Sequence, residues 1–133
     1  MKEMPDFLSV DDVILIHENQ IDLYGGAKGI RDEGLLESAL SMPQSIFGGE
    51  FLHPTLFDMA GAYLFHLVKN HPFVDGNKRT GATAALVFLI MNGYELVVEE
   101  DIFEQLFWDL AAGKIEKEEL GPFLYKNSVE VEK

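Results

Sequence analysis

The chain has 133 residues, of which 47% are hydrophobic and 25% charged, a balance typical of one globular domain, residues 1–133, with a substantial hydrophobic core. Its formal net charge is −13, and so negative a protein repels nucleic acid, which argues against direct binding of DNA or RNA. Cysteine is absent, which excludes disulfides and thiolate metal sites and suits the reducing cytoplasm.

No pattern in the sequence predicts export or membrane insertion. Residues 1–6 contain acidic side chains and a proline rather than a basic segment followed by an apolar one. The longest apolar run, residues 82–91, is too short to cross a bilayer and follows two cations. We therefore expect a cytoplasmic protein that does not enter a membrane, with this run in a buried helix.

Apolar residues at helical spacing predict two helices in the first third of the chain. Ser9 is suited to cap the first helix, which should end at Gly25-Gly26. Asp32 is suited to cap a shorter second helix, which should end at Pro43. The apolar face of the first helix comprises Val10, Val13, Ile14, His17, Ile21 and Tyr24.

Residues 44–52 separate these helices from two longer ones. Their pattern is not helical, and they form either a hairpin-like flap beside the functional site or a plain surface loop. Pro54 is suited to the first position of a third helix, which carries an apolar stripe over residues 56–70. A fourth helix should run from about Asn77 to the turn at Asn92-Gly93. Because it is rich in small residues, we expect it to be the central helix.

The last third of the chain predicts two further helices. Residues 94–98 are a short extended stretch, expected to be a lone strand, and residues 100–112 have helical spacing. Residues 116–126 should form a sixth helix that Gly121-Pro122 kinks or delays, and residues 127–133 should fray. The predicted fold class is therefore mostly α, with about six helices around a central helix and a short flap or hairpin.

The most reactive stretch, H-P-F-V-D-G-N-K-R-T, runs from His71 to Thr80 and joins the third and fourth helices. Pro72 disfavours helical geometry at the residue before it, so the third helix should end at His71. The unpaired amides and positive dipole end of the fourth helix form an anion site. Lys78 and Arg79 add two positive charges to that site, which predicts a cradle for phosphate.

Two further side chains of this stretch complete a reactive set. Asp75 offers hard oxygen ligands that suit magnesium. His71 carries the side chain type that exchanges protons near neutral pH. A base, a metal-binding carboxylate and a phosphate cradle within nine residues indicate phosphoryl or nucleotidyl transfer.

Each of these residues has a simpler explanation when taken alone. His71 could be a structural histidine at a helix end, and Asp75-Gly76-Asn77 could be a turn with a helix cap. Lys78 and Arg79 could be solvated, although the helix dipole disfavours cations in a first turn. An anion bound between them and the helix end removes that conflict.

The other histidines have no predicted role. His17 and His66 lie on apolar faces and are expected to be packed, whereas His53 could belong to the segment 44–52. None of the three has the spacing of a zinc-binding motif.

The central stretch resembles the signature of the Fic/Doc superfamily, whose Fic branch reads H-P-F-x-x-G-N-G-R-x-x-R. Lys78 stands where Fic enzymes have their second glycine, and Ala82 stands where they have their final arginine. Both departures are similar to the Doc (death-on-curing) branch. The resemblance extends over most of residues 9–113, including Tyr24-Gly25-Gly26 and residues 29–40.

The resemblance implies an all-helical Fic fold and a toxin of a toxin–antitoxin pair. Doc toxins are protein kinases that use ATP to phosphorylate a threonine of elongation factor Tu and so halt translation. Fic relatives instead transfer AMP from ATP to a protein hydroxyl, and a catalytically idle binding module is a third possibility. A lysine at position 78 fills the room for an α-phosphate, and Ala82 removes an outer-phosphate clamp. A nucleotide bound with its γ-phosphate at the helix end is then favoured.

Residue roles follow from the same resemblance. His71 would take the proton from the target hydroxyl, and Asp75 would hold magnesium or orient that hydroxyl. Lys78 and Arg79 would bind the transferring phosphate. Asn77 would also offer its side-chain amide, whereas Thr80 could merely cap the helix. The nucleotide-binding set comprises Gly76, Asn77, Lys78, Arg79 and Thr80.

Regulation is expected to come from a separate protein. Some Fic proteins carry an inhibitory helix with the pattern [ST]-x-x-x-E-[GN], and here Ile14 and Gly29 stand where the Ser or Thr would be required. The resemblance to Doc implies a Phd-like antitoxin, whose disordered tail folds into a groove of the toxin.

Overall fold

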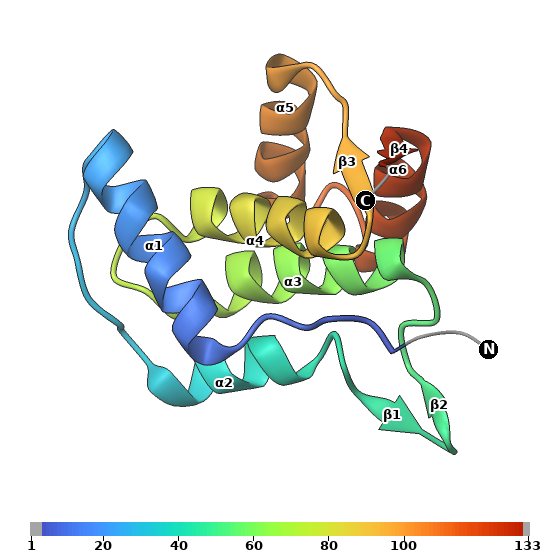
Figure 1. Cartoon of the computed structure of the whole chain (residues 1–133). Coiled ribbons are helices and arrows are strands. Elements are labelled where there is room, and N and C mark those ends of the chain that lie inside the picture. Colours follow the sequence, from blue (N-terminus) through green and yellow to red (C-terminus); the bar gives the residue numbers. More distant parts are fainter. Residues whose placement is uncertain (1–3, 132–133) are drawn as a thin grey trace.

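The computed structural model describes residues 4–131 and shows a predominantly helical protein (Figure 1). Its centre is a hairpin of two antiparallel helices, α3 (Leu56–Asn70) and α4 (Asn77–Met91). Helix α1 (Val10–Tyr24) packs on α4, and α2 (Glu33–Ser41) packs on α3. In the part of the chain that the structure describes, no helix is long and apolar enough to cross a membrane.

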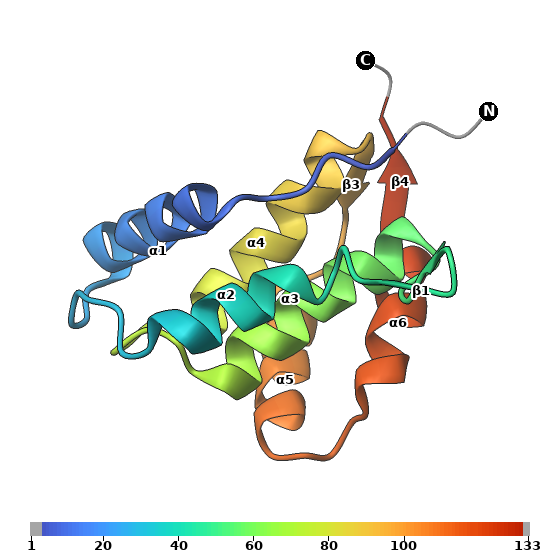
Figure 2. The same ribbon diagram turned by 90° about the horizontal axis from the view of Figure 1, so that it is seen from below.

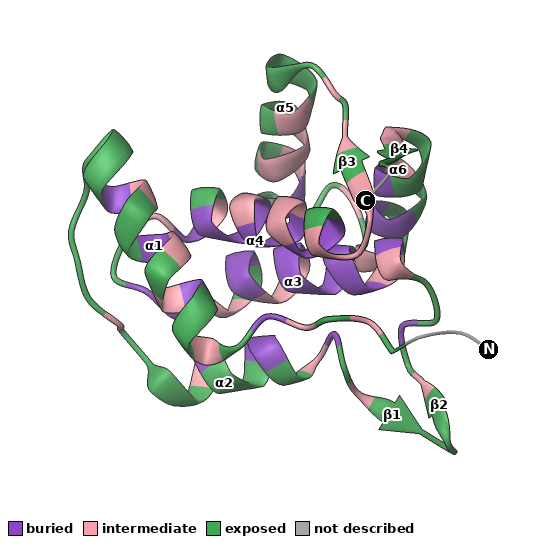
Figure 3. Cartoon of the chain, viewed as in Figure 1, coloured by how far each residue is buried: buried purple, intermediate pink, exposed green. Residues whose placement is uncertain are grey.

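The most enclosed helix is α3 and not α4, which corrects the prediction from small residues. Helix α3 contacts α2, α4, α5 (Glu100–Ala111) and α6 (Leu120–Lys126), and Figure 3 shows it largely buried. The small residues of α4 serve this contact: a Cβ at Gly81 would lie 3.3 Å from the backbone oxygen of Leu64. Within the run 82–91 the residues are buried or half-buried, as expected, except Ile90, which is 59% exposed.

Helix α3 begins after a threonine cap rather than at Pro54. The Oγ1 atom of Thr55 accepts a hydrogen bond from the amide of Asp58 at 3.0 Å and donates to the carboxylate of Asp58 at 2.9 Å. This pairing satisfies one of the free amides of the first turn. Pro54 therefore precedes the cap, where its missing N–H has no cost.

Residues 44–52 form the hairpin, although not where it was predicted. Strand β1 (Ile46–Phe47) pairs with β2 (Glu50–Phe51), and both glycines of the turn between them, Gly48 and Gly49, have positive φ. This hairpin lies at the opposite end of the molecule from the first turn of α4 (Figures 1 and 2). It is therefore not a flap over the site described below.

Two predictions for the last third of the chain are wrong in the same way. Strand β3 (Tyr94–Leu96) is not alone, because it pairs antiparallel with β4 (Ser128–Glu130). The segment expected to fray thus forms a strand; residues 132 and 133 lie outside the described range.

The sixth helix is delayed as expected, since the 3₁₀ turn η1 (Lys117–Glu119) precedes α6. Pro122 then falls in the first turn of α6, where its missing donor is not needed.

The loop between α3 and α4 is fixed to the segment that follows α1. The guanidinium of Arg31 donates to the carbonyl oxygens of Asn70 and His71 at 2.9 and 2.7 Å. The amides of Arg31 and Asp32 both donate to the carbonyl of Pro72, at 2.7 and 3.0 Å. These bonds satisfy carbonyls that the end of α3 leaves free, and they place a cation where the helix dipole favours one.

Replacing Arg31 should loosen this loop. The substitution Arg31→Met removes the two charged donors, and we expect the free energy of unfolding in urea to fall by about 1–2 kcal/mol. Lys69→Met is the matched control, because it removes an exposed cation from the last turn of the same helix. An equal loss of stability in the two variants would mean that the hydrogen bonds of Arg31 do not hold the loop.

Candidate active site

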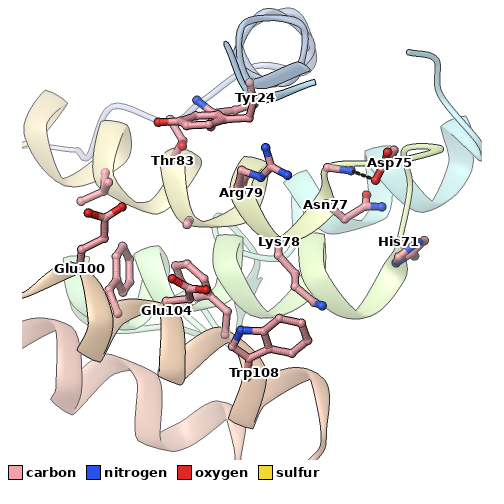
Figure 4. Close-up of a pocket in the computed structure, with 16 residues that line it drawn as sticks. Tyr24, His71, Asp75, Asn77, Lys78, Arg79, Thr83, Glu100, Glu104 and Trp108 are labelled. Carbon is pink, nitrogen blue, oxygen red and sulfur yellow. Dashed lines mark hydrogen bonds between the residues drawn. The ribbon is translucent and has the colours of Figure 1, made fainter. Parts of the chain in front are cut away.

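A pocket of about 570 Å³ opens at the first turn of α4, between α1 and α5 (Figure 4). This volume is in the range of small-molecule sites. Polar and charged side chains gather around the α3–α4 loop, whereas α4 and α5 also supply apolar ones. The lining comprises Gln20, Tyr24, His71, residues 75–79, Ala82, Thr83, Leu86, Glu100, Phe103, Glu104, Phe107 and Trp108.

His71 lies at the end of α3 in a left-handed conformation, with φ 53° and ψ 51°. It is the one residue other than glycine with positive φ among residues 4–131. Pro72 accounts for this, because it disfavours the right-handed region at the preceding residue, and the bond from Arg31 holds the His71 carbonyl. A backbone outlier that its surroundings fix in this way is typical of functional sites. The side chain is exposed at the edge of the pocket.

The loop is pinned from inside by Phe73. Its ring is buried and stacks on the ring of His17, with centroids 3.8 Å apart and planes 5° from parallel. The Nε2 atom of His17 donates to the carbonyl of Asp75 at 2.8 Å. His17 is therefore packed, as predicted, but it also fixes the backbone of the reactive stretch.

Both polar atoms of the Asn77 side chain bind the backbone of the loop, which the sequence did not predict; the expected role of this amide toward a ligand stays a prediction. Its Oδ1 atom accepts from the amide of Phe73 at 2.9 Å, and its Nδ2 atom donates to the carbonyl of Phe73 at 3.0 Å. The side chain is 4% exposed. Asn77 lines the pocket as the first residue of α4.

Thr80 does not line the pocket and does not cap the helix. It is fully buried inside α4, and its hydroxyl has no hydrogen-bond partner among the described residues. The N-cap is Gly76, in left-handed geometry with φ 76° and without a side-chain hydrogen bond. The amides of the first turn are thus left without a cap, which is the condition for binding an anion.

Asp75 faces the segment after α1. Its Oδ2 atom accepts from the amide of Ala27 at 3.2 Å, and its Oδ1 atom accepts from the amide of Gly76 at 2.9 Å. These two hydrogen bonds, that of Ala27 first, hold the pKa of the Asp75 carboxyl below its ordinary value. Gly26 has φ 121°, and a Cβ there would lie 2.7 Å from Oδ2, so only glycine allows this approach.

The site offers one carboxylate to a metal ion at the loop. No group of three or more acidic or histidine side chains that could hold a metal occurs within residues 4–131. Magnesium is commonly held by one or two carboxylates together with waters and substrate phosphates. Each oxygen of Asp75 accepts a single protein hydrogen bond and retains a further lone pair. The residues therefore fit a magnesium ion shared with a phosphorylated ligand.

The two cations of the pocket rest on aromatic rings. The ammonium of Lys78 lies 4.0 Å from the ring centroid of Trp108, and the guanidinium carbon of Arg79 lies 5.0 Å from that of Tyr24. No role was predicted for either ring. Tyr24 belongs to the apolar face predicted for the first helix, yet this residue is 64% exposed. Trp108 could have been singled out from the sequence, because it is a large aromatic residue that does not lie on the apolar stripe of its helix.

His66 and His53 lie away from the pocket. The ring of His66 is half-buried and contacts Lys117, with Nε2 and Nζ 2.9 Å apart. The ring packs against Phe65 and Lys117, as expected of a packed histidine, and this burial, followed by the charge of Lys117, lowers the pKa of His66 to about 4. His53 is buried before α3 rather than part of an open flap.

Comparison with known proteins places this geometry in a family. The family model described as Fic/DOC family matches residues 7–89, more than half of the chain. A protein named Toxin Doc from Mycolicibacterium smegmatis is 39% identical over 99 residues, which cover 74% of each chain. A protein named Protein kinase doc from Escherichia phage P1 is 34% identical over 89 residues, which cover 67% of this chain and 70% of the relative. The chain belongs to the Fic/DOC family.

Proposed function

We propose that this protein is a Doc-type toxin that acts as a Ser/Thr protein kinase. It transfers the γ-phosphoryl group of ATP to a threonine of a translation factor of the elongation factor Tu type and so halts translation. The observation that carries the proposal is one pocket in which His71, Asp75 and two cations surround the uncapped start of α4. The names of the two relatives, Toxin Doc and Protein kinase doc, support it.

The phosphates bind at the first turn of α4. Its free amides and dipole attract the anion, and Lys78 and Arg79 supply two charges whose donors suit phosphate oxygens. In a protein with a net charge of −13, such a local positive site is where an anionic substrate is steered.

The positions of the polar and apolar lining residues favour a nucleotide whose γ-phosphate lies at the α3–α4 loop. The apolar lining, Leu86, Phe103 and Phe107, lies on α4 and α5, away from the α3–α4 loop, and suits a base. The side chain at position 82 is a methyl group, 6% exposed, where a Fic-type arginine would hold outer phosphates. A nucleotide with its base against the apolar lining presents its terminal phosphate to the loop. This orientation supports phosphoryl transfer over AMP transfer.

His71 acts as the base in the transfer. It takes the proton from the threonine hydroxyl of the target, whose oxygen forms a bond to the γ-phosphorus while the bond from that phosphorus to the bridging oxygen of ADP breaks. Phosphothreonine and ADP are the products. The fixed backbone at His71 holds the ring at the pocket edge, where a protein substrate can approach.

Asp75 and the groups at the start of α4 both help to stabilise the negative charge of the phosphates. A magnesium ion, with Asp75 as its protein ligand, would neutralise charge on the phosphates when bound. The backbone at Gly76 and Asn77 lines the phosphate pocket, and the amide of Asn77 together with the side chains of Lys78 and Arg79 stabilises charge on the transferring group. Asp75 is ionised at neutral pH, as an aspartate ordinarily is, and its lowered pKa extends the ionised state to more acidic solution.

The protein acts in the cytoplasm, where its target is found, and is restrained by a separate Phd-like antitoxin. A toxin requires such restraint in its own host, and the relative named Toxin Doc supports this part of the proposal. An antitoxin gene beside the toxin gene is the expected arrangement.

ATP labelled at both the α- and the γ-phosphate distinguishes the two transfer reactions. Incubation of the protein, magnesium and elongation factor Tu with this ATP should leave the γ-label, and no α-label, on a threonine of the target. Mass spectrometry of the target checks the position and the added mass. An α-labelled target would instead establish AMP transfer.

Removal of His71 tests whether catalysis is the activity. We expect His71→Ala to lower the rate of phosphate transfer by roughly a hundredfold or more and to abolish growth inhibition. His66→Ala is the matched control, because that ring lies outside the pocket. Growth inhibition that survives in His71→Ala would support the catalytically idle binding module.

Asp75→Asn tests the metal ligand. The amide cannot supply the negative charge that magnesium prefers. The magnesium concentration for half-maximal transfer should therefore rise at least tenfold, on the order of the loss of metal affinity seen when a residue around a metal site is replaced. Asp101→Asn, an exposed change in the first turn of α5, should leave it unchanged. An unaltered magnesium dependence in Asp75→Asn would remove Asp75 from the metal site.

A further inference from the structure

Both cations at the start of α4 are held by aromatic faces that belong to other helices. Trp108 comes from α5 and Tyr24 from α1, and Figure 4 shows them on opposite sides of the first turn of α4. The cation-to-ring distances are 4.0 Å for Lys78 and 5.0 Å for Arg79. Trp108 is 55% exposed and Tyr24 is 64% exposed, so neither ring is in place to fill the core.

Carboxylates would be the ordinary partners of these cations in so acidic a chain. Aspartate and glutamate number 23 against 10 lysines and arginines, and Glu100 and Glu104 line the same pocket. Nevertheless the one salt bridge among residues 4–131 joins Lys28 to Asp22, and neither residue lines the pocket.

The choice of partner decides what the cation can still bind. A carboxylate occupies N–H donors and neutralises the charge, so a phosphate must compete with it. A ring attracts the cation through its face and takes no conventional hydrogen bond from it. The three donors of an ammonium and the five of a guanidinium therefore stay available for phosphate oxygens.

We propose that Trp108 and Tyr24 are positioning residues that hold Lys78 and Arg79 beside the uncapped start of α4 with their donors free. The inference rests on the proposed function, because it assigns the rings to the phosphate site of that reaction. Two long side chains that are already in place lose less conformational freedom when the phosphate binds. The aromatic pair thus raises the affinity for the polyphosphate part of the substrate without contacting it.

Stacking of Trp108 on the nucleotide base is the competing role for an exposed indole in such a pocket. The ammonium of Lys78 already occupies the ring face in the structure, which favours the positioning role. The two roles differ in their dependence on the base: a positioning ring affects every polyphosphate, whereas a stacking ring affects only nucleotides.

Calorimetric titration with ATP and with inorganic tripolyphosphate, both in magnesium, separates these roles. We expect Trp108→Leu and Tyr24→Leu each to weaken binding of both ligands by roughly two- to fivefold, the range that cation–ring contacts at exposed sites imply. Trp108→Phe and Tyr24→Phe keep a ring and should retain most of the affinity. Phe47→Leu is the control, since that ring is 81% exposed on the distant hairpin.

A double substitution shows whether Trp108 acts through Lys78. In a Lys78→Gln background the cation is gone, so adding Trp108→Leu should cause no further loss of tripolyphosphate affinity. The chain contains one tryptophan, and the emission of Trp108 should change in Lys78→Gln without any ligand. The ring contact is thereby checked independently of binding.

The outcomes are distinct. A loss for ATP alone, or an undiminished effect of Trp108→Leu in the Lys78→Gln background, would overturn the positioning role and leave the proposed kinase intact. Failure of the wild-type protein to bind either ligand would overturn the proposed function and this inference with it. The expected result is an equal loss for both ligands in each leucine variant, with the loss from Trp108→Leu vanishing in the Lys78→Gln background.

Discussion

The side-chain amide of Asn77 closes the loop between α3 and α4 on itself, and the geometry of the pocket depends on that closure. Its two hydrogen bonds to the backbone of Phe73 are buried, where an unpaired amide would be costly. Phe73 is also fixed against His17, and Pro72, just before it, disfavours helical geometry at His71. His71 is consequently held in left-handed geometry on one side, and α4 starts with an uncapped turn on the other.

Charge is arranged on a larger scale around this loop. The protein is strongly acidic, and two cations stand in the first turn of α4, where the dipole of the helix disfavours them. An anionic ligand at that turn removes the conflict. The contacts with Trp108 and Tyr24 stabilise the cations while the ligand is absent. Both the two cations and the uncapped amides of the first turn therefore suit the binding of an anion.

Local signals in the sequence predicted the helices and the reactive loop. The caps Ser9 and Asp32 and the start of α4 at Asn77 are confirmed, because each depends on a few neighbouring residues. The run from His71 to Arg79 was likewise recognisable, and the structure brings six of its residues to one pocket: His71, Asp75, Gly76, Asn77, Lys78 and Arg79.

Features that depend on partners far along the chain were not predictable. The pairing of β3 with β4 joins residues more than thirty positions apart, and the enclosure of α3 depends on how four helices meet. The same holds within the site. The sequence offers Asn77 and Thr80 as polar groups, and only the packing reveals that one is used inside the loop and the other is buried. Trp108 and Tyr24 come from helices whose approach to α4 no local pattern encodes.

A crystal structure of the wild-type protein with magnesium and a non-hydrolysable ATP analogue would show the orientation of the nucleotide. The γ-phosphate is expected within hydrogen-bond distance of the first-turn amides of α4 and of Lys78 and Arg79, with the His71 ring facing it from the pocket edge. An α-phosphate in that position, or a nucleotide bound away from the start of α4, would contradict the proposed kinase.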